Sequence, residues 1–300
     1  MPFASSALFG CNYGLYSARC SYCFPNYRLS STIHRRLRIA RTLANDTAAL
    51  QDGGFIETVC SSSNADADST VIRTLSLQQK ERISLFVGSL LEWNERMNLT
   101  AVKQRSDVMK RHVEDSLALL PLLRRSYLSW CCPASSPSSC DGLRLVDVGS
   151  GSGLPAWKVT LLDSMHKRCL FLEHVVALIG LSNVEVLCER AENVGQCLDF
   201  RETFDVAIAR AVAEMRTLAE YCLPLVRIGG LFIAAKGHNP QEEIRNAERA
   251  VQLMGGSILE LCSVESHSPL GQRTAVICFK GKATPKKYPR NTGIPSKMPL

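Results

Sequence analysis

The sequence predicts an α/β fold in which helices cover a mostly parallel sheet. Three observations lead to this prediction. From residue 142 onward, short apolar runs alternate with helical patterns, as in chains that build parallel sheets. A glycine-rich turn, "GSGSG", follows the first apolar run. The last two runs, "SILELCSV" and "RTAVICFK", have no helix between them and therefore predict an antiparallel pair.

Composition and charge separate the body of the chain from its two ends. The chain has 300 residues, 46% of them hydrophobic, but no uninterrupted apolar run of membrane-spanning length, so we expect a soluble protein without a membrane partner. The net charge is +7. Residues 1–45 contain six Arg and no acid, and residues 280–300 contain five Lys, one Arg and no acid. A mildly acidic body therefore carries two basic ends.

Residues 1–70 have the composition of an address and a linker. Their first part is rich in Ser and Arg, which is typical of mitochondrial and chloroplast transit peptides, and "SSSNADADST" is typical of a linker. Ser with small and aromatic residues favours the chloroplast stroma over the mitochondrion. A basic arm that binds RNA is the alternative. Of the 13 cysteines, Cys20 and Cys23 form a CxxC without a second pair, so we expect no metal site.

Residues 71–130 predict a helical cap. Ser76 and Gln79 match a capping box, and "NLTA" at 98–101 breaks the first helix. A second helix follows, and Pro121 ends or kinks it. The apolar residues of the first helix recur at helical spacing: Ile83, Val87, Leu90 and Leu91.

A Ser/Pro-rich loop, 131–141, separates the cap from the main domain, 142–280. In order, the main domain predicts strands at "LRLVDV" and "KVTLLD", a helix at "SMHKRCLFLEHVVALIG" closed by Gly180, and strands at "VEVLC" and "DVAIAR". A helix at "MRTLAEYCLPLV", a strand at "GGLFIAAKG", a helix at "PQEEIRNAERAVQLMGG" and the antiparallel pair complete it. Residues 281–300 are a basic tail.

The glycines predict a ligand site at the carboxyl ends of the strands, where open α/β sheets bind ligands. Gly149 and Gly151 let the backbone turn sharply and approach a ligand. Asp163 ends the next strand, where a carboxylate suits a ribose with two free hydroxyls. The spacing is G-x-G-x-G, which with Asp163 and the final hairpin favours a methyltransferase-type cofactor site. A turn that binds NAD, or one that is purely structural, is the alternative.

A resemblance covers residues 78 to 300. It is carried by "WNERMNLTAV", "RHVEDSL", "VDVGSGSGLP", "VTLLDSMHKRCLFLE", "RAENVG", "DVAIARAVA", "GGLFIAAKG" and "TPKKYPRNTGIPSKMPL". These motifs resemble the RsmG (GidB) family, S-adenosylmethionine-dependent enzymes that methylate guanine N7 in small-subunit ribosomal RNA. The resemblance implies a Rossmann-like class I methyltransferase sheet with an N-terminal helical cap.

The resemblance also implies the cofactor residues. Beside Asp163 and Gly151, the contacts to S-adenosylmethionine fall on Gly149, Leu154, Ala191, Glu192 and Arg210. Each has a structural alternative: Leu154 in the core, Glu192 as a solvated acid at a helix start, Arg210 in a surface ion pair. Because guanine N7 has an available lone pair, we expect no general base, and Arg210 orients the reactants.

The RNA partner is expected to be the small-subunit ribosomal RNA or the small ribosomal subunit, bound by a monomer. The residues expected to contact it through phosphates or guanine edges are Arg111, His112, Lys167, Arg168, Lys236, Lys286, Lys287 and Arg290. In the tail, Tyr288 is expected to stack on a base. A satisfied core histidine at His112 and a solvated, disordered tail are the alternatives.

The connection after the glycines is short. Only residues 149–157 join the first two strands, whereas a parallel crossover usually needs about a dozen residues or more. A splice variant or a misjudged exon boundary would explain the difference from the family. We expect the second strand to slide and carry Asp163 away from Gly149, or the glycine turn to be pulled straight. Three functions stay open: an active RNA methyltransferase, an RNA-binding protein that lost the cofactor, and a methyltransferase of a small molecule or protein.

Overall fold

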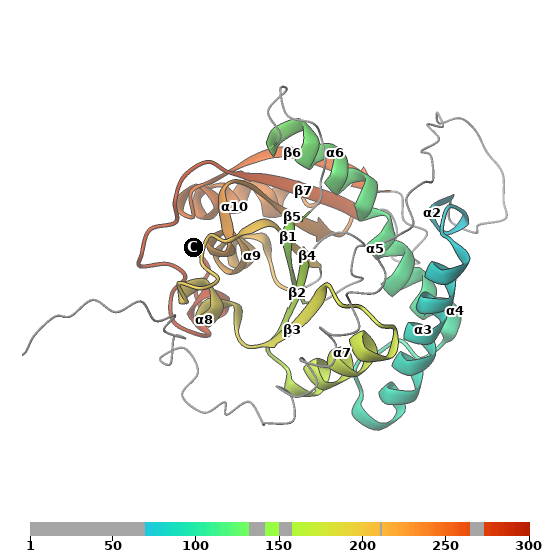
Figure 1. Cartoon of the computed structure of the whole chain (residues 1–300). Helices are drawn as coiled ribbons and strands as arrows, with labels where there is room; N and C mark the ends of the chain where they lie inside the picture. Colours follow the sequence, from blue (N-terminus) through green and yellow to red (C-terminus); the bar gives the residue numbers. More distant parts are fainter. Residues whose placement is uncertain (1–69, 132–141, 150–157, 211, 265–272) are drawn as a thin grey trace, which may run out of the picture. The chain divides into compact units, whose positions relative to one another are not determined.

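A seven-stranded sheet organises the structure, a computed structural model that describes residues 70–131, 142–149, 158–210, 212–264 and 273–300 (Figure 1). The strand order is β3-β2-β1-β4-β5-β7-β6. Neighbours from β3 to β5 pair in parallel, and β7 is antiparallel to both β5 and β6. The bounds are β1 Arg144–Val148, β2 Lys158–Asp163, β3 Val184–Cys188, β4 Phe204–Arg210, β5 Val226–Lys236, β6 Gly256–Val264 and β7 Arg273–Lys280. The predicted parallel sheet and its antiparallel end are confirmed.

The short connection after β1 does not displace β2. Arg144 pairs with Lys158 and Val148 pairs with Leu162, so the two strands are in register along their length. The expected sliding of β2 is therefore wrong. Asp163 directly follows Leu162, the last residue of β2 that pairs with β1. Residues 150–157 lie outside the described residues, so a straightened glycine turn stays a prediction.

Helices cover both faces of the sheet, because residues along each strand point alternately to opposite sides. Side chains such as Val159 and Leu161 pack against α3 (Leu77–Met97), α6 (Leu119–Cys131) and α7 (His166–Leu178). Their neighbours pack against the other layer, formed by α8 (Ala191–Gln196), α9 (Met215–Cys222) and α10 (Gln241–Leu253). Figure 1 shows α9 and α10 on one side of the sheet and α3, α6 and α7 on the other.

The first helix of the cap begins and ends where the sequence predicts. The capping box of Ser76 and Gln79 is present at the start of α3, with N···O distances of 2.9 and 3.2 Å. Asn98 ends α3 in the left-handed conformation, at φ 47°. A four-residue helix, α2 (Thr70–Arg73), precedes α3.

The predicted second helix of the cap is not continuous. It consists of α4 (Arg105–Val108), a π-helical turn η1 (Met109–Glu114), α5 (Asp115–Leu117) and α6. The interruption at Ala118, between α5 and α6, agrees with the predicted effect of Pro121, which lacks the amide hydrogen that would bond to the carbonyl of Leu117. The pattern of the sequence does not predict the π-helical turn.

Two further boundaries differ from the prediction. The helix predicted at "MRTLAEYCLPLV" ends at Cys222, because Pro224 cannot donate a helical hydrogen bond, and a 3₁₀ turn η2 (Leu223–Leu225) leads into β5. The tail forms ordered contacts and the short helix α11 (Ile294–Lys297), so the interpretation of 281–300 as a solvated end is wrong.

No helix among the described residues combines the length and apolarity needed to cross a membrane.

Candidate active site at the carboxyl edge of the sheet

The candidate site lies where β1 and β4 end side by side. The chain leaves β1 toward β2 and β3 and then returns to β4 on the other side, so this is the topological switch point at which open α/β sheets bind ligands. Gly149 follows β1 at φ +89°, and its amide donates to the carbonyl of Leu162 at 3.0 Å. An added Cβ would lie 2.5 Å from Cγ2 of Val212, so this position requires glycine. Gly151 and Leu154 lie outside the described residues.

Asp163 brings a buried carboxylate to the same edge. It is 7% exposed, and its Oδ1 accepts from the amide of Met165 at 2.8 Å. Its Oδ2 lies 3.4 Å from the guanidinium of Arg168. A carboxylate has about four lone-pair sites, so these contacts leave acceptors for hydroxyl donors. The predicted RNA residue Arg168 therefore lies beside the predicted cofactor acid.

A chain of hydrogen bonds joins the end of β4 to the cap. The guanidinium of Arg210 donates to Oγ of Ser116, and the Ser116 hydroxyl donates to the carbonyl of His112. Ser116 is buried and lies four residues after His112, the usual spacing for such a bond within a helix. Ser116 is not among the predicted site residues, although it is part of the motif "RHVEDSL".

His112 has a hydrogen-bond partner of its own beside this contact. Its Nε2 lies 3.1 Å from Oγ1 of Thr100, which also accepts from the amide of Val102. Burial, followed by the positive charge of Arg210, lowers the pKa of His112 below its ordinary value, against the opposing effect of Asp115. His112 thus has a hydrogen-bond partner, as expected for a structural histidine. It also lies near Arg210 in the candidate site.

Thr100 was missed as a site residue, although "NLTA" marks it. Its amide donates to Oδ1 of the buried Asn94 at 2.8 Å, and Nδ2 of Asn94 donates to the carbonyl of Val102 at 3.3 Å. Asn94 therefore fixes the loop that carries Thr100 to His112.

Arg111 has a hydrogen-bond donor that no described residue accepts. It lies in the π-helical turn next to His112, and its Nε is buried without a hydrogen-bond partner among the described residues. A buried guanidinium N–H needs an acceptor, because leaving it unsatisfied costs about 1–3 kcal/mol or more. Arg111 is therefore suited to receive an acceptor from a bound molecule.

Three of the other predicted RNA residues have structural partners instead. The Lys167 ammonium donates to the carbonyls of Met97 and Asn98 at the end of α3, at 2.8 and 2.9 Å. Lys236, at the end of β5, contacts Glu243 at 2.5 Å. Arg290 of the tail makes a bidentate pair with buried Glu220, with its closest N···O distance at 2.7 Å.

The tail also uses other predicted residues. One oxygen of Glu192, which is 2% exposed next to Ala191 on α8, accepts from the amide of Gly293 at 2.9 Å. Tyr288 is 7% exposed and cannot stack on a base, which corrects the expectation for this residue. Lys286 and Lys287 are exposed and remain available to an anionic partner.

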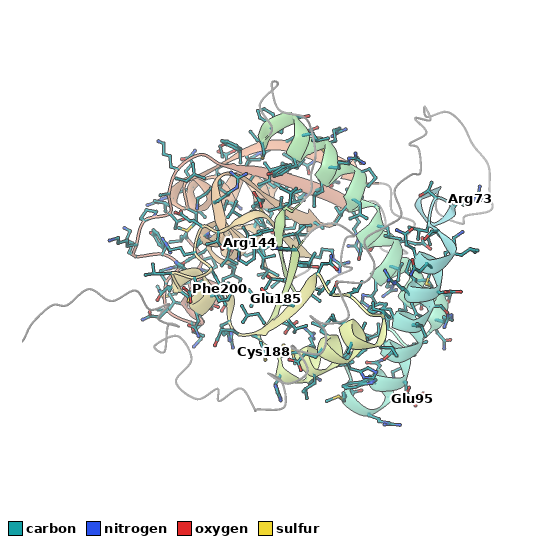
Figure 2. The ribbon with its side chains drawn as sticks, viewed as in Figure 1. Arg73, Glu95, Arg144, Glu185, Cys188 and Phe200 are labelled. Carbon is teal, nitrogen blue, oxygen red and sulfur yellow. The ribbon has the colours of Figure 1, made fainter. Side chains whose placement is uncertain are left out.

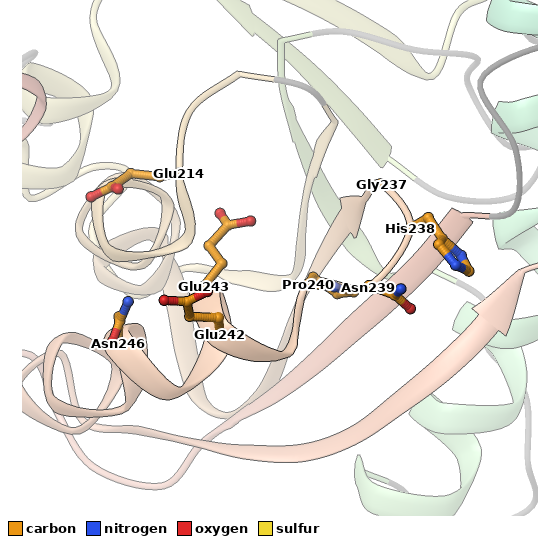
Figure 3. A pocket seen from close by; sticks show the side chains of 8 residues that line it. All are labelled: Glu214, Gly237, His238, Asn239, Pro240, Glu242, Glu243 and Asn246. Atoms are coloured by element: carbon orange, nitrogen blue, oxygen red, sulfur yellow. The ribbon is translucent and has the colours of Figure 1, made fainter.

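A pocket of about 460 Å³ lies further along the edge, beyond β4 (Figure 3). Its side chains come from Glu214 ahead of α9, from the loop after β5 and from the start of α10. The carboxylates of Glu214, Glu242 and Glu243 give it an acidic lining that disfavours RNA phosphates. The cap side of the site, by contrast, carries the cationic side chains of Arg111 and Arg210.

Strand order, an antiparallel β7 and a switch-point site with an acid at the end of β2 define the class I S-adenosylmethionine-dependent methyltransferase fold. The family model of rRNA small subunit methyltransferase G matches residues 79–271. The ribosomal RNA small subunit methyltransferases G of Bacillus cereus strain B4264 and Bacillus thuringiensis strain Al Hakam are each 37% identical over 236 residues, covering 76% of this chain and 93% of theirs. The chain belongs to this family of methyltransferases.

The solved structures to which the chain is similar share little sequence with it. TrmN from Thermus thermophilus is 18% identical with a TM-score of 0.39, covering 57% of this chain and 52% of that one. MtNAS in complex with MTA and tNA is 16% identical with a TM-score of 0.42, covering 72% and 78%.

Proposed function

We propose that this protein transfers the methyl group of S-adenosylmethionine to N7 of a guanine in the small-subunit ribosomal RNA of an organelle. The observation that carries the proposal is the meeting, at one switch point, of Asp163 on one side of Gly149 and the Arg210–Ser116–His112 contact on the other. A ribose-binding acid and an anion-binding cap are the two halves that such a reaction needs.

The residues present fit the cofactor. The open acceptor sites of buried Asp163 suit the two ribose hydroxyls, and the backbone at Gly149 turns without a side chain. When bound, S-adenosylmethionine supplies an electrophilic methyl group on a positively charged sulfur. Carried over from the family, Ala191, Glu192, Gly151 and Leu154 complete its contacts.

The remaining residues orient the RNA. Guanine N7 presents a lone pair and needs no proton removed, so alignment of the reactants supplies the catalysis. Arg111 and Arg210 provide donors for a phosphate or for the O6 and N7 edge of guanine.

The compartment follows from the first region of the chain. The acid-free, Ser- and Arg-rich start of the sequence supports import into the chloroplast stroma, where ribosomes are of bacterial type. Residues 1–60 fused to a fluorescent protein should enter chloroplasts. Cytosolic or purely mitochondrial fluorescence would contradict this placement. We expect the enzyme to act as a monomer.

Methyl transfer from labelled S-adenosylmethionine to small-subunit RNA or subunits tests the activity, and strand scission by aniline after borohydride reduction locates N7-methylguanine. Arg111→Ala should weaken RNA binding by ~1–3 kcal/mol if Arg111 reads a base, or reduce the salt slope by about 1 if it contacts a phosphate. Arg249→Ala, an exposed arginine on α10, is the matched control. RNA binding without cofactor binding in calorimetry would favour the cofactor-free alternative.

A further inference from the structure

Two cysteines flank the backbone of Asp163. Cys188, labelled in Figure 2, is the last residue of β3 and pairs with Asp163 across the sheet. Cys169 lies in the first turn of α7, and its thiol donates to the carbonyl of Asp163 at 3.2 Å. Cys188 also contributes to the raised pKa of the Cys169 thiol, which places the two thiols close together. Both sulfurs therefore lie next to the acid that we assign to the cofactor ribose.

The two thiols differ in reactivity. Cys169 is 1% exposed, and burial, followed by its contact with Cys188, raises its pKa well above the ordinary value, so its thiolate is scarce and attacks only a disulfide held next to it. Cys188 is half-buried, and its Sγ lies 4.0 Å from Nδ1 of the exposed His166. A neighbouring imidazole can take up the thiol proton, and the thiolate is the form that attacks disulfides.

We propose that Cys169 and Cys188 are a modification site that forms a reversible disulfide by exchange with a small external disulfide, such as oxidised glutathione. The thiolate of Cys188, whose proton passes to His166, attacks one sulfur of the external disulfide and releases one small thiolate, which takes up a proton. The sulfur of Cys169 then attacks the sulfur of Cys188 and releases the second small thiol, which takes the Cys169 proton. Two cysteines are oxidised and one external disulfide is reduced.

The new bond changes the surroundings of Asp163. It removes the thiol hydrogen that Cys169 donates to the Asp163 carbonyl, and it ties α7 to the end of β3. We expect the oxidised protein to bind S-adenosylmethionine at least about tenfold more weakly, the effect of losing roughly one charge-assisted hydrogen bond. This consequence rests on the proposed function, whereas the disulfide itself does not.

The sequence makes the disulfide easy to measure. The full chain is treated with oxidised glutathione and then unfolded in the presence of an alkylating agent. Trypsin then cleaves after Arg168 and Arg190 and releases one peptide that contains both cysteines. We expect this peptide to lose two hydrogens and to resist alkylation. Cleavage after Glu173 and Glu185 should leave two fragments joined only by the disulfide. A fully alkylated peptide, or glutathione retained on Cys188 of the unmutated chain, would overturn the proposal.

Variants separate the two cysteines. Cys169→Ser should retain glutathione on Cys188, and Cys188→Ser should leave Cys169 unmodified; equal oxidation of Cys169 in the second variant would contradict the order of attack. Cys131→Ser, a half-buried cysteine at the end of α6, is the matched control and should form the disulfide normally. Calorimetry on reduced and oxidised chains then tests the cofactor effect. A disulfide in a chain that binds no cofactor in either state would refute the proposed function alone.

Discussion

Asp163 has two roles at the end of β2. It accepts from the amide of Met165, next to the start of α7, and it offers acceptors to a ribose. Asp163→Asn keeps an acceptor for that amide and removes the charge. We therefore expect it to weaken S-adenosylmethionine binding by ~1.5–3 kcal/mol for each charge-assisted bond lost, with little change in Tm. Calorimetry measures the loss, and Asp199→Asn on the exposed surface is the control. Unchanged affinity would make Asp163 a purely structural residue.

Lys280 is a fully buried cation near the end of the sheet. Its ammonium contacts the carbonyl of Leu223 at 2.7 Å and Glu202 at 3.2 Å, but burial outweighs these contacts and lowers its pKa to about 8. The unfolded chain therefore binds one more proton than the folded chain between pH 8 and the ordinary lysine pKa of about 10.4, so folding becomes more favourable as pH rises through this window.

This titration predicts a measurable difference from Lys280→Met. The free energy of unfolding of the natural chain, minus that of the variant, should increase by up to about 3 kcal/mol between pH 8 and 10.5, because one pKa unit corresponds to ~1.4 kcal/mol. Denaturant titrations across the window measure this difference, in which the cysteine and tyrosine titrations cancel. A constant difference would show that Lys280 titrates normally in the folded state.

At the scale of elements, the tail acts as a strap over α8 and α9. Arg201 donates to the carbonyls of Tyr288 and Thr284 at 2.7 Å, and Arg290 pairs with Glu220, which is fully buried. Arg290→Ala leaves that carboxylate uncompensated and should lower the free energy of unfolding by about 3–5 kcal/mol. The pair Arg290→Met with Glu220→Gln should recover much of the loss. Equal stability of Arg290→Ala and the natural chain in denaturant titrations would contradict this role.

How far the sequence predicts these elements depends on how local their determinants are. The capping box at Ser76 and the strand "KVTLLD" are decided by neighbouring residues, and the structure has both as predicted. The pairing of Arg290 with Glu220 does not follow from the sequence, because the two residues lie 70 positions apart in the chain. The contact of Ser116 with Arg210 likewise joins the cap to β4 and follows from tertiary packing alone.

At the scale of the whole molecule, Lys286 and Lys287 remain exposed although the tail around them is anchored. Deleting residues 281–300 would remove structural contacts together with charge, so point substitutions test RNA binding better. Lys286→Ala with Lys287→Ala should leave Tm unchanged. It should reduce the slope of the logarithm of the RNA-binding constant against the logarithm of the salt concentration by about 1 for each lysine that contacts a phosphate. Lys80→Ala with Arg245→Ala removes the same exposed charge elsewhere. Identical slopes for both double variants would exclude these two lysines from the RNA surface.

At this scale, we expect cofactor binding to depend on the connection between β1 and β2. Because the register of β1 and β2 is intact, a longer connection would not need to realign Asp163 with Gly149. A helix after the glycines would instead offer amide donors at its start and shield apolar sheet surface. Inserting a ten-residue helix-forming segment after Pro155 should therefore strengthen S-adenosylmethionine binding and raise Tm, whereas a Gly/Ser insertion of equal length should do neither. If the natural chain methylates RNA as fast as the chain with the helix-forming insertion, its short connection already forms a working site.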